Sequence, residues 1–91
     1  VVGGGNLGRR SRCIEVVGAT PIGRATASVA LFNRCSTPCF VYKVCADDVC
    51  ELVRREVPAN SYEIVRIDSE EFVEALQRGA KAVAYVFTER E

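Results

Sequence analysis

The sequence contains no histidine, although it has five cysteines. Without an imidazole, the chain cannot form a Cys–His catalytic pair or a zinc site of mixed Cys and His ligands, and no histidine is available as a general base. The cysteines also lack the C-x-x-C spacing of dithiol redox motifs. We therefore expect no catalytic residues and no enzymatic activity.

Long apolar runs are absent as well. No run approaches the roughly 18 residues that a membrane-spanning helix requires, and no signal-peptide pattern is present. We expect a cytoplasmic protein with no membrane partner. The formal net charge is zero, from 12 Lys or Arg and 12 Asp or Glu, which argues against a strong general polyanion binder.

The charges are nevertheless unevenly distributed. Residues 1–34 hold five Arg and one Glu, a balance of +4, and residues 35–91 hold seven Lys or Arg against eleven Asp or Glu, a balance of −4. This asymmetry permits a basic face towards the N-terminal end of the chain.

An odd number of cysteines excludes complete pairing within one chain. The last four follow the pattern C-x3-C-x5-C-x4-C, which differs from the two C-x2-C knuckles of a zinc ribbon. We therefore expect no metal and no cofactor. The sequence leaves open whether the chain holds a disulfide or only buried and free thiols. The five positions are Cys13, Cys35, Cys39, Cys45 and Cys50.

A length of 91 residues predicts one domain. We expect a flexible leader over residues 1–12 and a single domain over 13–91. The leader contains a formal G-x-G-x-x-G pattern, but it lacks the preceding strand and following apolar helix of a dinucleotide site. Its arginines Arg9, Arg10 and Arg12 are the best electrostatic candidates for phosphate contacts.

The hydrophobic pattern predicts the order β-α-β-α-β-connection-β. Strands are expected at 13–18, 39–45, 61–67 and 81–89, and helices at 22–33 and 48–57. Small and apolar residues favour the first helix. Asp47 or Asp48 can cap the second, and with Asp48 as the cap Glu51 completes a variant capping box. Residues 69–79 fit either a short helix, capped by Ser69 and ended at Gly79, or a hairpin arm.

At this point the residues resemble a family. Gly18-Ala19-Thr20-Pro21, the "LFN" at 31–33 and Lys43 in "FVYK" are similar to the opening of Alba, a family of small archaeal chromatin and RNA-binding proteins. The resemblance covers about residues 13–90 and lies mainly in the order of elements. Ala19 and Thr20 replace the paired lysines of that family, and the expected arm carries Glu70, Glu71 and Glu74.

The resemblance implies an α/β (α+β) two-layer sandwich that acts as a homodimer, or as a heterodimer with a paralogue. It also implies weak, salt-sensitive binding to RNA or DNA through contacts with the nucleic-acid backbone. We expect no sequence-specific base recognition. The expected nucleic-acid contacts are Arg9, Arg10, Arg12, Arg24, Lys43, Arg78 and Lys81.

Two alternatives remain open from the residues. One is a Rossmann-like nucleotide or small-ligand module, with a phosphate at the turn from Gly18 to Gly23. The other is a protein–protein interaction subunit of the same Alba-like fold that has lost nucleic-acid binding, which the zero net charge favours. Tyr42, Tyr62 and Tyr85 are expected in the core or at an interface.

Overall fold

The computed structural model describes residues 9–10 and 12–86 and consists mainly of antiparallel β-strands. One short helix, α1, lies between the last two strands. The elements in chain order are β1 (Arg9–Arg10), β2 (Ile14–Pro21), β3 (Ala27–Asn33), β4 (Cys39–Ala46), β5 (Val49–Val57), β6 (Tyr62–Ile67), α1 (Glu70–Gln77) and β7 (Ala82–Val86).

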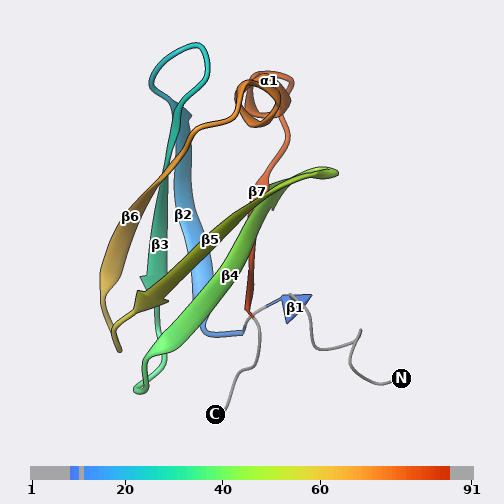
Figure 1. Cartoon of the computed structure of the whole chain (residues 1–91). Coiled ribbons are helices and arrows are strands. Elements are labelled where there is room, and N and C mark those ends of the chain that lie inside the picture. Colours follow the sequence, from blue (N-terminus) through green and yellow to red (C-terminus); the bar gives the residue numbers. More distant parts are fainter. Residues whose placement is uncertain (1–8, 11, 87–91) are drawn as a thin grey trace.

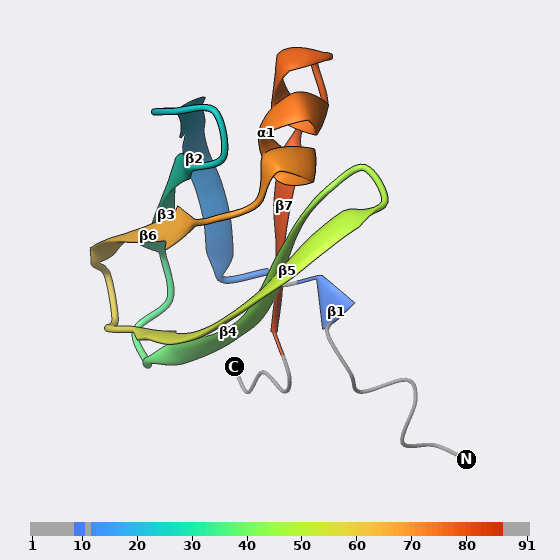
Figure 2. The same cartoon turned by 45° about the horizontal axis from the view of Figure 1, so that its top comes forward.

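The strands form two sheets with the orders β2-β3-β6 and β1-β7-β4-β5. The chain makes the β2–β3 hairpin, crosses to the other sheet for the β4–β5 hairpin, and returns to add β6 beside β3. After α1 it crosses again, so that β7 pairs with β4. Figures 1 and 2 show the two sheets on opposite sides of the molecule, with α1 at one end and β1 at the other.

A single apolar core lies between the sheets and under α1. Alternate residues of β3 point into it, namely Ala27, Val29 and Leu31, and Phe72 of α1 is fully buried in the same cluster. Because each sheet contributes one face to this core, the fold is a β-sandwich whose second faces point outward.

The expected α/β fold class is wrong, because two segments expected to be helices are strands. The first, at 22–33, consists of a loop followed by β3, which pairs with β2 on one side and β6 on the other. Its apolar residues fit a period of two as well as a helical stripe, and central strands take such apolar sequences when both neighbours pair with them.

The second wrongly predicted helix, at 48–57, is β5. Asp47 and Asp48 form the two-residue turn of the β4–β5 hairpin and do not cap a helix, and Asp47 has a φ of 58°. Cys45 and Cys50 are cross-strand partners joined by a disulfide. The covalent pairing across this hairpin overrides the helical spacing of the apolar residues.

The remaining expected elements correspond to the structure. The strands expected at 13–18, 39–45 and 61–67 match β2, β4 and β6, and the one at 81–89 matches β7 as far as Val86. Of the two readings of 69–79, the helix is confirmed: Ser69 Oγ accepts a hydrogen bond from Phe72 N at 3.1 Å. Gly79, with a φ of +96°, follows the end of this helix.

The predicted leader is only partly visible. Residues 1–8 and Ser11 lie outside the described residues, while Arg9 and Arg10 form β1 and pair with Val86 and Tyr85. Cys13 just beyond β1 is joined to Cys35 by the second disulfide. Cys39 is buried and belongs to neither bridge.

Candidate protein-interaction surface

The β2-β3-β6 sheet presents a face to the exterior. Each row across this face contains one residue from each strand, as the register of the three strands shows. The rows alternate with the buried residues of β3, so their side chains point away from the core. We call this surface the outer face; its rows are Glu15–Phe32–Tyr62, Gly18–Ala30–Ile64 and Thr20–Ser28–Arg66.

Apart from Glu15, the first two rows of the outer face are apolar. Tyr62 is 65% exposed and Ile64 is 60% exposed, although both are large hydrophobic side chains. The rings of Phe32 and Tyr62 contact each other, with centroids 4.6 Å apart and planes inclined by 41°. Val17, in the bulge of β2 beside these rows, is also exposed. Contiguous exposed apolar groups of this kind mark interaction sites on soluble proteins.

The centre of the outer face is flat. Gly18 and Ala30 are partners in the middle row, and a Cβ added at Gly18 meets nothing within 4 Å. Glu15 and Arg66 carry opposite charges at opposite corners. Arg66 Nε lies 3.3 Å from Asp68 Oδ1, but both side chains are largely exposed, and such surface pairs contribute little. Arg66 is therefore available to a partner.

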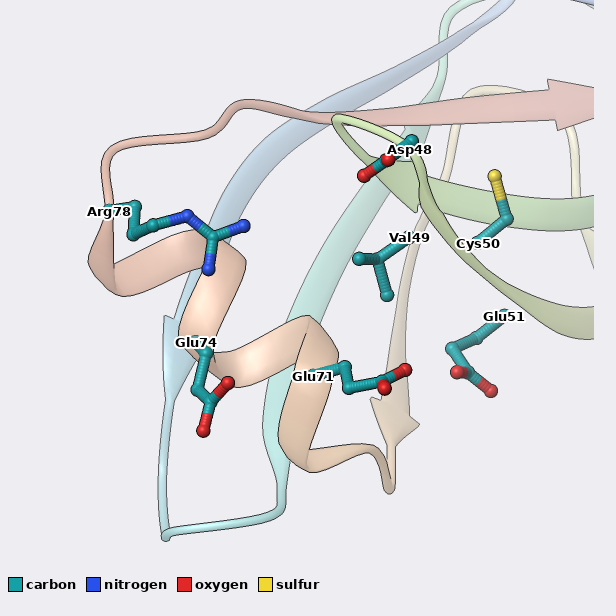
Figure 3. A pocket seen from close by; sticks show the side chains of 7 residues that line it. All are labelled: Asp48, Val49, Cys50, Glu51, Glu71, Glu74 and Arg78. Atoms are coloured by element: carbon teal, nitrogen blue, oxygen red, sulfur yellow. The ribbon is translucent and has the colours of Figure 1, made fainter.

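A hollow lies between the turn of the β4–β5 hairpin and α1 (Figure 3). Four carboxylates and one guanidinium line it, together with Val49 and Cys50. The charged groups are Asp48, Glu51, Glu71, Glu74 and Arg78. In the part of the chain that the structure describes, no group of three or more His, Cys, Asp or Glu residues is arranged to hold a metal ion.

The residues expected to contact nucleic acid do not gather on one surface. Arg12 is exposed beside Cys13, at the end of the sandwich where β1 lies, and Arg24 is exposed in the β2–β3 loop at the opposite end (Figure 1). Lys43 lies on β4, with its Nζ 5.2 Å from the centroid of the Tyr85 ring. These three cations belong to three separate regions of the molecule.

Arg78 and Lys81 are the other two expected nucleic-acid contacts whose side chains are described, and they lie in different hollows. Arg78 shares the acidic hollow, where the surrounding carboxylates weaken the attraction for phosphate. Lys81 lies in a groove between β2 and β7. The side chains of Arg9 and Arg10 lie outside the described part of the structure.

The turn from Gly18 to Gly23 does not lead into a helix. It covers the end of β2 and the start of the β2–β3 loop, where Ile22 N donates a hydrogen bond to Thr26 O at 2.9 Å. A Rossmann-like phosphate site needs a helix N-terminus at this point. All strand pairs within residues 9–10 and 12–86 are antiparallel.

Sequence reasoning missed the outer face, although part of its signal was present. In the segment Tyr62–Ile67, alternate residues point to opposite faces, and both faces contain large apolar residues. Such a strand is either central and covered on both sides or exposes apolar groups to a partner. Because 22–33 was expected to be a helix, Phe32 could not be paired with Tyr62.

Comparisons of this chain with protein-family models, curated proteins and solved structures found no match. Over the described residues, no helix is long and apolar enough to cross a membrane.

Proposed function

We propose that this chain is a protein-interaction module that associates with a second copy of itself through the outer face. The observation that carries this proposal is the contiguous exposure of Tyr62 and Ile64 beside Phe32 on one side of a sheet. Exposed aromatic and aliphatic groups, together with an arginine at the margin, are typical of the composition of protein interfaces. The zero formal net charge removes long-range repulsion between copies.

The outer face is complementary to itself. A two-fold axis in the plane of the interface, along the diagonal from Tyr62 to Thr20, exchanges the corners occupied by Glu15 and Arg66. Each carboxylate then faces the guanidinium of the other copy. The same axis places Phe32 against Ile64 of the second copy and the two Ala30 residues opposite each other. Every large apolar group thus meets an apolar group, as an isologous interface requires.

The size of the face predicts a weak complex. Five residues along a strand span roughly 17 Å, and three strands span roughly 14 Å with their side chains. The resulting patch of about 240 Å² in projection is smaller than the roughly 800 Å² of accessible surface that each partner buries in a standard interface. We therefore expect a dimer with a dissociation constant in the micromolar range or weaker.

Sedimentation velocity over a range of protein concentrations tests this proposal. The wild-type sedimentation coefficient should rise with concentration, and Ile64→Glu should remove the rise by placing a charge against Phe32 of the second copy. Leu52→Glu is the matched control, because Leu52 is 58% exposed on β5 of the other sheet. A monomer at all concentrations, or an equal effect of both variants, would reject the proposal.

RNA or DNA binding is the second candidate function, and one observation favours it. Arg34 Nε donates a hydrogen bond to Arg12 O at 2.9 Å, which places two arginines together at the end of the sandwich where β1 carries Arg9 and Arg10. Fluorescence anisotropy with single-stranded RNA should then show affinity that falls steeply with salt. The variant Arg9→Ala/Arg10→Ala/Arg12→Ala should weaken it, and no binding at low salt would reject this function.

A further inference from the structure

The two disulfide bridges differ in how far solvent reaches them. Cys50 of the Cys45–Cys50 bridge is exposed, although Cys45 is only 5% exposed. In the other bridge, Cys13 is 2% exposed and Cys35 is partly buried against the apolar core. Exposed disulfides are the labile ones, because an attacking thiolate must reach a sulfur atom to cleave the bond. Of the two bridges, Cys45–Cys50 meets this condition.

The backbone around the Cys13–Cys35 bridge is held by hydrogen bonds from other residues. Arg34 N donates to Cys13 O at 3.0 Å, and Asn60 N donates to Cys35 O at 3.1 Å. Cys35 N in turn donates to the side-chain oxygen of the buried Asn33 at 3.0 Å. These contacts keep both cysteines in place, so an external thiolate reaches this bridge only after this end of the sandwich opens.

The sulfur atom of Cys50 lies at an edge of its sheet. Cys50 belongs to β5, which is the last strand in the order β1-β7-β4-β5, and no described strand pairs with the other side of β5. Val49 and Glu51 point into the hollow beside α1, and Cys50, as the residue between them, points to the opposite face of β5 (Figure 3). The turn of this hairpin projects from the sandwich (Figure 2), so solvent reaches Cys50 from beyond the edge.

The position of the bridge decides which sulfur is attacked. In thiol–disulfide exchange, the incoming sulfur approaches along the S–S bond from the side opposite the leaving sulfur. For attack at Cys50, this approach comes from beyond the edge strand β5. For attack at Cys45, it comes from over β7, where the partly buried Val83 is the partner of Cys45. Access therefore makes Cys50 Sγ the attacked sulfur and Cys45 Sγ the leaving group.

The charge around Cys50 is mainly negative. Asp48 belongs to the turn beside the bridge, and Glu51 follows Cys50 in the strand. Lys43 lies on the neighbouring strand, but its Nζ is directed to β7, 5.2 Å from the centroid of the Tyr85 ring. Carboxylates next to the bridge repel anions. The bridge therefore favours a thiol whose substituents carry no further negative charge.

The bridge also closes the turn of the hairpin. Asp47 has a φ of 58°, a conformation that residues other than glycine rarely adopt, and the adjacent Asp48 carries the same charge. The rest of β4 is held independently, because it pairs with β5 on one side and β7 on the other. Opening the bridge therefore loosens the turn and leaves the sheet in place.

We propose that the Cys45–Cys50 bridge is a reversible redox site, which a dithiol without negatively charged substituents opens. One thiolate of the dithiol attacks Cys50 Sγ, the S–S bond breaks, and Cys45 Sγ leaves as a thiolate that takes a proton from water. The second thiolate of the dithiol then attacks the dithiol sulfur of the mixed disulfide, which closes a disulfide in the reductant and releases Cys50 as a thiolate that is protonated in turn. Two electrons thus pass from the dithiol to the bridge.

The reaction is reversible because the ladder between β4 and β5 keeps the two reduced cysteines opposite each other. Exchange with an oxidised disulfide closes the bridge again and returns the two electrons. The site lies on the β1-β7-β4-β5 sheet, so it is separate from the outer face and does not depend on the proposed self-association.

Differential alkylation of the folded wild-type protein tests this site. Dithiothreitol is the dithiol, N-ethylmaleimide blocks the thiols that it releases, and peptide mass spectrometry identifies the blocked cysteines. Cys45 and Cys50 should be blocked at least about tenfold faster than Cys13 and Cys35. In guanidinium chloride, where the fold is lost, the two bridges should react within about threefold of each other. A sample without dithiothreitol gives the background from Cys39, which belongs to neither bridge.

A monothiol identifies the attacked sulfur. Treatment of the folded protein with 2-mercaptoethanol, followed by N-ethylmaleimide, should leave the mercaptoethanol adduct on Cys50 and the maleimide on Cys45. This distribution follows from the difference in access to the two sulfur atoms.

A pair of charge variants tests the preference among thiols. The measured quantity is the rate with the anionic 2-mercaptoethanesulfonate divided by the rate with 2-mercaptoethanol. Asp48→Asn should raise this ratio about twofold at low salt, because it removes a negative charge near the bridge. Glu15→Gln is the matched control, since Glu15 is exposed on the other sheet, and it should leave the ratio unchanged.

The proposal is overturned if the two bridges of the folded protein open at equal rates, or if neither opens before the protein unfolds. Adducts divided equally between Cys45 and Cys50 would also overturn it, as would an equal response of Asp48→Asn and Glu15→Gln. None of these results bears on sedimentation, so failure of this site and failure of the outer face are distinguishable.

Discussion

The side-chain amide of Asn33 donates a hydrogen bond to the backbone carbonyl of Val57, 24 residues further along the chain, at 3.1 Å. The same Nδ2 also donates to Thr37 O at 2.9 Å, and Oδ1 accepts from Cys35 N at 3.0 Å. Asn33 is completely buried. One side chain thus joins the end of β3, the following turn and the end of β5.

Asn33→Ala should destabilise the domain by about 2–4 kcal/mol, because it leaves buried backbone groups without their partners. Thr37→Ala is the control, since it keeps the carbonyl of residue 37 and changes an exposed side chain. Urea denaturation of both variants measures the difference. Equal stability of Asn33→Ala and wild type would contradict this role.

The two disulfides should contribute unequally to stability. The bridge Cys13–Cys35 closes a sequence separation of 22 residues and Cys45–Cys50 one of 5. In the chain-entropy model, replacing both cysteines by Ala should cost about 3 kcal/mol for the first pair and about 2 kcal/mol for the second. Thermal and urea unfolding of the two double variants gives the order, and the reverse order would show that native contacts outweigh loop entropy.

Replacement by alanine should lower the stability of the protein at Gly79 and leave it almost unchanged at Gly18. Gly79 has a φ of +96°, where a Cβ is strained, so Gly79→Ala should cost about 1–2 kcal/mol. Gly18 lies in a strand, and an added Cβ meets nothing within 4 Å. Gly18→Ala should therefore lie within about 0.5 kcal/mol of the wild type. A loss of stability in Gly18→Ala as large as that in Gly79→Ala would contradict the view that only Gly79 needs a glycine for its backbone conformation.

Local signals predicted some elements of this fold well. The helix α1 begins at a serine cap and ends before a glycine, and both signals lie within the segment itself. The strands β4 and β6 have runs of β-branched and aromatic residues that favour no other structure.

The errors lie where pairing with another strand, and not the local propensity of the segment, decides the structure. β3 contains Ala27, Ala30 and Leu31, which favour a helix locally, but it is fixed by ladders with β2 and β6. β5 is fixed by the Cys45–Cys50 bridge, and the sequence alone left the pairing of the cysteines open. The outer face could not be predicted, because it exists only once β3 and β6 lie side by side.

The positions of the arginines in space also depend on the fold and could not be predicted from the sequence. The excess of arginine in residues 1–34 was visible in the sequence, whereas its division between the two ends of the sandwich was not. Arg24 and Arg12 are 12 positions apart and lie at opposite ends, because β2 runs the length of the molecule between them.

Self-association through the outer face is tested most directly by amide NMR spectra of the wild-type protein recorded during dilution from millimolar to micromolar concentration. We predict concentration-dependent shifts of the amides of Ala30, Phe32, Tyr62 and Ile64, with the amide of Leu52 unchanged. Spectra that do not change on dilution, or shifts confined to the β1-β7-β4-β5 sheet, would contradict the account.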